Sequence, residues 1–280
     1  MTRTLRQQPK PITATGMPPH RACYYGDGGV GKTTLLLSYP SPLVIDTDGG
    51  LEGDALGSIG GKAEEWAPEK WSDLADLYFW LKTEVKRKGY QTIGIDSIDQ
   101  LARLLRYEAT DMPNKSRSEN QWQEELTTSD QQDYGKVSDA IDRFLSNLRI
   151  LSRESGVHVV LTSAVRLPDK EKGRFKRTFD VQPAVEGTIK YWCNIYGELV
   201  LVETNDGGKK NAKNEPIMVE HRILWTRASD PARVGKTRFG ALRPGVTDPT
   251  FALMRKKIEA SVVAPAATTT KTAAAGKAGK

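Results

Sequence analysis

Residues 24–34 read YYGDGGVGKTT, and this stretch decides the fold. It fits the spacing Gly-x-x-x-x-Gly-Lys-Ser/Thr at Gly26, Gly31, Lys32 and Thr33. Glycines let the backbone wrap closely around a polyphosphate with its N–H groups turned inward. The lysine contacts the β- and γ-phosphates, the threonine hydroxyl ligates Mg²⁺, and the N-terminus of the next helix attracts the anion. The stretch therefore predicts a loop for ATP and Mg²⁺ in preference to a glycine turn without a ligand.

The residues predicted to bind the nucleotide form one uninterrupted run. They follow the β-forming ACYY and lead into the helix-forming TLLLS, which is the strand–loop–helix context that the motif requires. The run comprises Gly26, Asp27, Gly28, Gly29, Val30, Gly31, Lys32, Thr33 and Thr34.

Length and composition indicate one main domain with appendages. With 280 residues, 38% of them hydrophobic, the chain can bury one substantial core. Polar or low-complexity ends predict a flexible arm at 1–20 and a disordered tail at 261–280, around a folded domain at 21–260. No apolar run approaches the roughly 20 residues of a membrane span, and the N-terminal segment lacks a secretory signal. We therefore expect a cytoplasmic protein with no membrane partner.

Charge and cysteine content are less informative. The net charge of +6 permits a nucleic-acid partner without requiring one, since part of the excess lies in the chain ends. Cys23 and Cys193 have no metal-ligand spacing, so both are interpreted as reduced packing residues. The three histidines show no ligand spacing either.

Apolar strand-like runs alternate with helical patterns, which predicts an α/β fold with a mostly parallel sheet flanked by helices. Strands are expected at 21–25, 42–48, 92–96 and 158–165, and helices at 71–89, 97–111 and 136–156. Two later runs, 195–204 and 221–227, suggest antiparallel strands that extend the sheet, with the turn-forming NDGG of 205–208 between them. The polar stretch 112–136 is too long for a plain connection and is interpreted as a lid or a partner loop.

Acidic residues follow two of the expected strands. Asp96 would stand at the carboxyl end of its strand and hold Mg²⁺, as a Walker B residue; the alternative is a cap for the helix that begins at Ser97. Asp46 and Asp48 end another strand, and one of them could polarise an attacking water. The alternative there is a solvated pair in a glycine-rich loop.

These residues resemble a known family. VIDTDGGL at 44–51 is similar to the strand that carries the catalytic glutamate in RecA-type ATPases, and IGIDSIDQL at 93–101 to their Walker B strand. The order of elements is similar over 21–245. The likeness extends to phage-encoded RecA-like ATPases of the Sak type, which pair with single-strand annealing functions; GDGGVGKT at 26–33 and KTRFG at 236–240 match them.

The resemblance assigns roles residue by residue. Lys32 and Thr33 are implied as phosphate and Mg²⁺ ligands, Asp96 as the Walker B acid and Asp48 as the catalytic carboxylate. Two departures stand out: Asp48 is one methylene shorter than the usual glutamate, and Ala164 occupies the place of the glutamine that couples ATP to DNA.

A basic segment follows the strand at 158–165. Cations that track phosphates, beside aromatic rings on which bases can stack, are typical of sequence-tolerant binding to single-stranded DNA. The resemblance places the DNA loop here, although a solvated hairpin fits the pattern as well. The candidate DNA-binding residues are Lys170, Lys172, Arg174, Phe175, Lys176 and Arg177.

A second basic pair, Lys236 and Arg238, lies two residues apart, so both side chains would share one face of an extended strand. It resembles the element by which RecA-type subunits reach the ATP site of a neighbour. The alternative is an exposed basic pair without a role.

Together these features lead to a hypothesis of function. We expect a Mg²⁺-dependent ATPase that forms oligomers or short filaments on single-stranded DNA and promotes annealing or strand pairing in phage recombination, with a phage single-strand-binding protein as a further partner. A helicase-like or loader ATPase is the alternative, and a small-molecule kinase the third.

Overall fold

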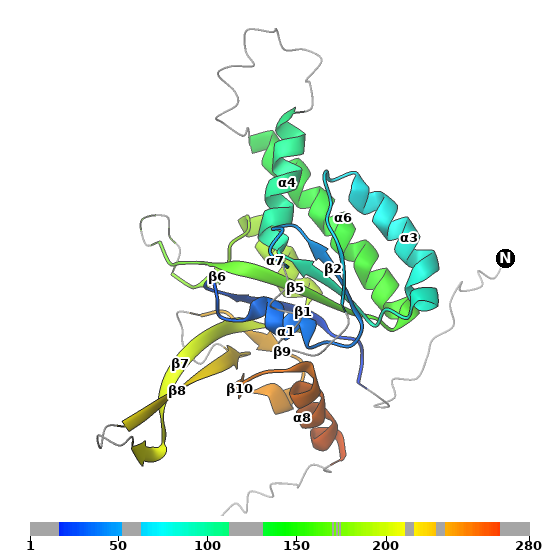
Figure 1. Cartoon of the computed structure of the whole chain (residues 1–280). Coiled ribbons are helices and arrows are strands. Elements are labelled where there is room, and N and C mark those ends of the chain that lie inside the picture. The colour runs from blue at the N-terminus through cyan, green and yellow to red at the C-terminus, as the bar shows by residue number, and fades with distance from the viewer. Residues whose placement is uncertain are drawn as a thin grey trace, which may run out of the picture.

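The computed structural model describes residues 17–51, 63–111, 131–169, 171, 173, 175–210, 216–227 and 233–263. Within these ranges a ten-stranded sheet crosses the molecule in the order β10-β8-β7-β1-β5-β4-β2-β3, with β6 on β5 and β9 on β7 (Figure 1). In the same ranges no helix is both long and apolar enough to span a bilayer.

The centre of the sheet is parallel. It consists of β1 (Arg21–Gly26), β5 (His158–Arg166), β4 (Thr92–Asp96), β2 (Pro42–Asp46) and β3 (Glu64–Trp66), with β7 (Ile195–Lys210) parallel to β1 on the other side. Strands β2 and β4 are buried throughout, because helices cover both faces of a parallel sheet. The predicted α/β fold with a mostly parallel sheet flanked by helices is confirmed, and β5 lies between β1, which leads into the glycine-rich loop, and β4.

Antiparallel strands extend the sheet beyond β7. They are β8 (Pro216–Trp225) and β10 (Gly245–Thr247), while β9 (Lys236–Thr237) pairs with the start of β7 and β6 (Thr178–Phe179) with the end of β5. The turn expected at 205–208 was wrong: β7 continues through NDGG, and its register against β8 shifts between Asn205 and Lys210. Pairs with β8 are formed at Asn205 and again at Lys210, so the residues between them form an irregularity of β7 of the β-bulge kind, and the chain reverses only after Lys210.

One face of the sheet is covered by α3 (Asp73–Lys88), α4 (Ile98–Asp111), α6 (Gln131–Ser155) and α7 (Pro183–Trp192) (Figure 1). Helix α3 buries Leu74, Leu77, Leu81 and Val85 at helical spacing. It ends at Gly89, whose φ of 78° is the left-handed conformation that favours glycine. Helix α6 begins earlier than the pattern predicted, and α7 was not predicted.

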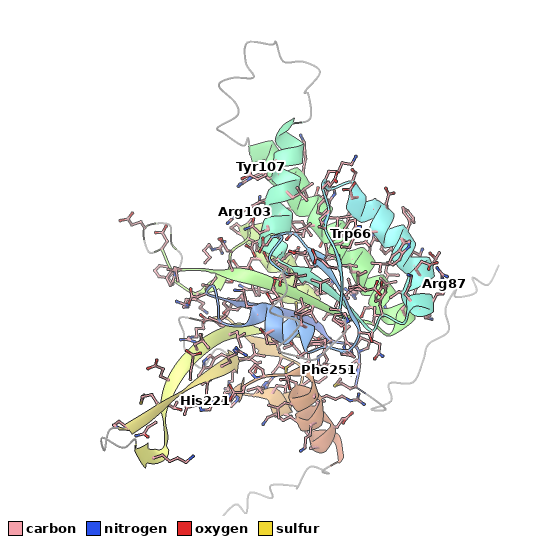
Figure 2. All side chains as sticks on the ribbon, viewed as in Figure 1. Trp66, Arg87, Arg103, Tyr107, His221 and Phe251 are labelled. Atoms are coloured by element: carbon pink, nitrogen blue, oxygen red, sulfur yellow. The ribbon has the colours of Figure 1, made fainter. Side chains whose placement is uncertain are left out.

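The opposite face is covered by α1 (Lys32–Leu37), the short η2 (Gly240–Leu242) and α8 (Phe251–Val263). His20 and His158 lie in an aromatic cluster with Tyr39 and Phe251, the residue at the start of α8 in Figure 2. His20 is therefore a buried packing residue, and His158 is a partly buried one at its edge. The thiols of Cys23 and Cys193 are buried and free, as expected of packing residues.

Candidate nucleotide-binding and catalytic site

The phosphate loop joins β1 to α1. Gly29 and Gly31 have φ angles of 75° and 89°, which strain any residue with a Cβ. At Gly26 an added Cβ would lie 2.3 Å from the carbonyl oxygen of Leu199, so only glycine fits beside β7. Asp27, Gly28 and Gly29 are exposed. The loop therefore presents its backbone to solvent in the conformation that its glycines permit.

Lys32 occupies the first position of α1, directly behind the loop. Its Nζ donates to the carbonyl oxygens of Gly26, at 3.1 Å, and Asp27, at 2.8 Å. Partial burial lowers the pKa of Lys32, and the nearby carboxylates of Asp96 and Asp99 oppose that shift. An ammonium group that bonds the loop's own carbonyls is placed to exchange them for phosphate oxygens, so the residues present fit a polyphosphate.

Asp96 ends β4 directly beside the first turn of α1. The Thr33 hydroxyl donates to its Oδ2 over 2.6 Å, and the Thr162 hydroxyl of β5 donates to its Oδ1. Only 9% of Asp96 is exposed. A carboxylate and a hydroxyl in contact are hard oxygen ligands of the kind that Mg²⁺ prefers when phosphates complete its shell. This geometry favours the Walker B interpretation over a helix cap.

Asp46 and Asp48 have different surroundings. The buried carboxylate of Asp46 accepts the backbone N–H groups of Asp48 and Gly49, both at 2.9 Å, and that of Leu51. Asp46 therefore shapes the loop after β2. The carboxylate of Asp48 instead accepts the Ser97 hydroxyl at 3.3 Å. Of the two, Asp48 is the one whose oxygens are not committed to backbone groups.

Asp99 was missed as a site residue. It is buried in the first turn of α4, and its Oδ1 accepts the backbone N–H of Ala164 at 3.0 Å. Partial burial raises the pKa of Asp48, and the negative charges of Asp99 and Asp96 add to that shift. The signal was a second acid in the same SIDQ run, which had been assigned to the helix alone. The backbone N–H of Ala164 is thereby donated to Asp99, and its methyl side chain adds no hydrogen-bonding group.

The last residues of the basic segment have different surroundings. Phe175 is 67% exposed and Lys176 is exposed. Arg177 instead turns toward the phosphate loop, where its Nη2 lies 3.0 Å from Oδ2 of Asp27. Lys170, Lys172 and Arg174 lie outside the described residues.

Lys236 and Arg238 lie at the other end of β1. Strand β9 pairs with the first two residues of β7, and the backbone N–H of Arg238 donates to the carbonyl oxygen of Asn194 at 3.0 Å. The Lys236 ammonium donates to the carbonyl oxygen of Lys190 at 2.8 Å, whereas Arg238 is exposed. Through the register of β7, Lys236 is level with Cys23, whereas Arg238 bonds Asn194 beside Arg21, at the start of β1. The phosphate loop follows the far end of the six-residue β1, which places Arg238 about 16 Å from it at roughly 3.3 Å per residue. Lys236 is nearer, but its ammonium is bonded to Lys190.

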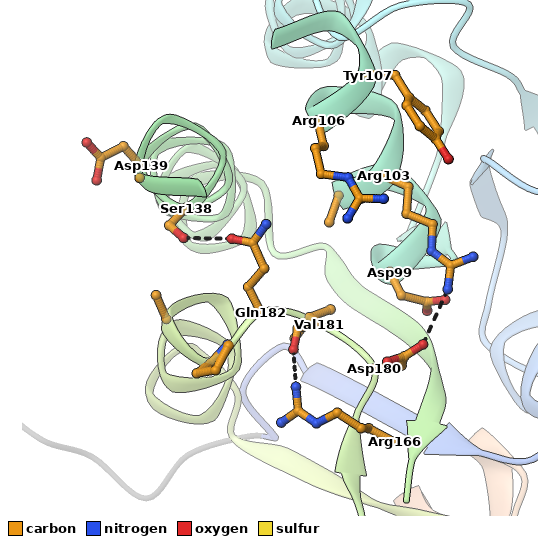
Figure 3. Close-up of a pocket in the computed structure, with 14 residues that line it drawn as sticks. Asp99, Arg103, Arg106, Tyr107, Ser138, Asp139, Arg166, Asp180, Val181 and Gln182 are labelled. Carbon is orange, nitrogen blue, oxygen red and sulfur yellow. Dashed lines mark hydrogen bonds and ion pairs between the residues drawn. The ribbon is translucent and has the colours of Figure 1, made fainter. Parts of the chain in front are cut away.

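A pocket of about 1010 Å³ opens beside Asp99, between α4, the start of α6 and the start of α7 (Figure 3). Its wall carries Arg103, which pairs with Asp180 at 3.3 Å, and Arg166, which donates to the carbonyl oxygen of Val181. Both arginines are thus held by protein partners.

Fold and loop together define the class: an α/β domain with a glycine-rich phosphate-loop sequence between a parallel strand and a helix. Residues 19–239 match the family described as AAA domain, and the chain belongs to that family. It is also similar to a solved structure titled "Crystal structure of the RadB recombinase", at 18% identity and a TM-score of 0.41, covering 73% of this chain and 87% of that one. A comparison with curated proteins found no match.

Proposed function

We propose that the protein hydrolyses ATP with Mg²⁺. The observation that carries this proposal is the Thr33–Asp96 contact of 2.6 Å, one residue after Lys32, at the mouth of a glycine loop. Within the described ranges, no group of three or more acidic, histidine or cysteine side chains could hold a metal on its own. The proposed Mg²⁺ site therefore needs the phosphate oxygens of the nucleotide, which is the usual arrangement for this ion.

Each residue has a distinct part in this proposal. Lys32 would bind phosphate oxygens, and Thr33 and Asp96 would hold a Mg²⁺ ion, whose charge would offset that of the phosphates when bound. Asp48 orients the attacking water and accepts its proton. Partial burial, with the negative charges of Asp99 and Asp96, raises the pKa of Asp48, and a stronger base takes a proton more readily.

We further propose that the protein acts on single-stranded DNA as a cytoplasmic recombination ATPase of the phage Sak type, alongside a phage single-strand-binding protein. The exposed Phe175 and Lys176, with the basic residues before them, supply stacking and phosphate contacts. The distance of Arg238 from its own loop supports an oligomer or short filament in which one subunit completes the site of the next.

The test measures phosphate release from ATP with and without single-stranded DNA, together with annealing of complementary strands and displacement of a paired strand. We expect DNA to stimulate hydrolysis and the protein to promote annealing without strand displacement. Displacement of the paired strand would favour the helicase-like alternative, and hydrolysis indifferent to DNA would remove the DNA proposal.

A second candidate is phosphoryl transfer to a small molecule. The pocket beside Asp99 favours it, because an anionic substrate could exchange with Asp180 for the guanidinium of Arg103 in its wall. Arg103→Ala distinguishes the two: a kinase would lose transfer to its acceptor, whereas a DNA-stimulated ATPase would keep hydrolysis.

A further inference from the structure

Arg177 lies at the end of the basic segment, yet its side chain is oriented toward the nucleotide site. Its Nη2 is 3.0 Å from Oδ2 of Asp27, the second residue of the phosphate loop. About a quarter of the Arg177 side chain is exposed, whereas that of Asp27 is 61% exposed. An ion pair with so exposed a carboxylate contributes little and is easily exchanged.

A second carboxylate holds Arg177 from the protein side. Glu198 of β7 is completely buried, lies opposite Tyr25 in the register of β1, and accepts Nε of Arg177 at 2.6 Å. Nη1 of Arg233 lies 3.5 Å from its other oxygen. A buried carboxylate is costly unless cations compensate it, so Glu198 fixes the guanidinium in place. The outer edge of the guanidinium is then left to face the loop.

The backbone of Arg177 is anchored as well. It forms a parallel bridge with Arg233, and its carbonyl oxygen lies 3.4 Å from the Tyr25 hydroxyl. Tyr25 is the residue before the loop begins at Gly26. Main chain and side chain are therefore both positioned against the end of β1, which a residue of a solvated hairpin would not require.

Asp27 contacts both Lys32 and Arg177. Its carbonyl oxygen accepts Nζ of Lys32 at 2.8 Å, and its carboxylate pairs with Arg177. Resting on the ATP binding proposed above, we propose that Arg177 is a polyphosphate-contacting residue supplied by the same chain, which exchanges Asp27 for the terminal phosphate of ATP. Phosphate offers the guanidinium two acceptor oxygens in the geometry that it prefers. Glu198 is a positioning residue for it.

The experiment compares binding of ADP with binding of a non-hydrolysable ATP analogue, by calorimetry, in the full chain with Mg²⁺. We expect Arg177→Ala to weaken binding of the ATP analogue roughly tenfold, as for a lost charged hydrogen bond. The affinity for ADP should stay within about twofold of the wild-type value. Arg143→Ala, which removes an exposed arginine of α6, is the matched control and should change neither. Affinity for single-stranded DNA without nucleotide should be unchanged in Arg177→Ala.

Arg177→Lys guards against misfolding, because lysine keeps a cation on Glu198 but lacks the planar fork. Should the alanine variant fail to fold, the lysine variant is expected to show the same selective loss for the analogue. Equal losses for analogue and ADP, no loss, or a loss confined to DNA would each overturn the proposal. Wild-type protein that binds neither nucleotide would instead remove the proposed ATPase function itself.

Discussion

The Thr33 hydroxyl donates a 2.6 Å hydrogen bond to Oδ2 of Asp96. This bond joins the first turn of α1 to the end of β4, although β5 lies between β4 and the strand that precedes the loop. Thr162 of β5 holds the other oxygen of the same carboxylate. Three elements therefore converge on one acid, which is the arrangement that a Mg²⁺ ligand beside a phosphate loop requires.

Thr33→Val tests this convergence directly. Valine keeps the shape of the side chain and removes the hydroxyl, so the proposed Mg²⁺ loses a ligand. We expect hydrolysis to fall by about a hundredfold, or ~3 kcal/mol in the barrier, with a higher Mg²⁺ requirement. Thr83→Val, on the exposed side of α3, is the control. Equal rates for the two variants in a phosphate-release assay would contradict the assignment.

The two acids after β2 should separate by phenotype. Asp48→Asn is expected to keep ATP binding and lose turnover, because only the orienting carboxylate is removed. Asp46→Asn is expected to lower the free energy of unfolding by about 1–3 kcal/mol, because an acceptor of three backbone N–H groups is weakened. Binding, turnover and urea unfolding of both variants decide the matter. An Asp46 variant that folds normally but does not turn over would reverse the roles.

DNA binding is tested by changing Lys170, Lys172 and Arg174 together to alanine. Each lost phosphate contact reduces the number of counterions released on binding. For single strands this lowers the steepness of a plot of log affinity against log salt concentration by roughly 0.7. We therefore expect the triple variant to bind DNA more weakly, with a slope that is shallower by up to about 2. A charge-matched control removes three exposed lysines of α3: Lys82, Lys86 and Lys88. Identical slopes for the two triple variants would leave the segment as a solvated hairpin.

Arg238 is expected to act on a neighbouring subunit. Arg238→Ala subunits keep an intact loop, and Lys32→Ala subunits keep an intact arginine, so a mixture of two inactive proteins should recover part of the hydrolysis. Activity per subunit should also rise with protein concentration, since a shared site forms only on association. If the variants co-assemble and the mixture stays inactive, the shared site is wrong.

The buried histidines predict a pH dependence of stability. Burial, with the charge of His158 nearby, lowers the pKa of His20 to about 3, while burial and Arg255 lower that of His158 to about 4. Both are neutral in the folded chain and take up protons near pH 6.5 when unfolded. Their contribution is therefore present above pH 6.5 and is lost as the pH falls toward 4.

When the pH falls from 6.5 to 5, we expect the free energy of unfolding to decrease by about 1.5 kcal/mol for each of the two histidines. His158→Asn should halve this dependence, because asparagine can still accept the backbone N–H of His20 that Nδ1 of His158 accepts at 2.9 Å. Urea unfolding at the two pH values gives the comparison. A variant with the full wild-type dependence would show that other groups titrate.

The sequence predicted what is local. The loop at 26–34, the strand that ends at Asp96 and the helix that ends at Gly89 each depend on residues close together in the chain. The strand expected at 42–48 is shorter and ends at Asp46, whose carboxylate accepts backbone N–H groups of the following loop. Tertiary contacts produced the rest: Glu198 on β7 holds Arg177 beside the loop, and β7 pairs with β8 on both sides of the run expected to turn, at Asn205 and at Lys210. The spacing of residues along the chain does not show that a buried carboxylate on a distant strand will contact Arg177.

Magnesium-dependent hydrolysis of ATP tests the central claim most directly. Phosphate release by the full chain is measured with Mg²⁺ and with excess chelator, for wild type and for Lys32→Ala. We predict hydrolysis by the wild type that stops when Mg²⁺ is removed, and none by Lys32→Ala, since the charge that binds the phosphates is gone. Equal phosphate release by both proteins, or release that persists in chelator, would contradict the assignment of Lys32, Thr33 and Asp96 as the catalytic centre.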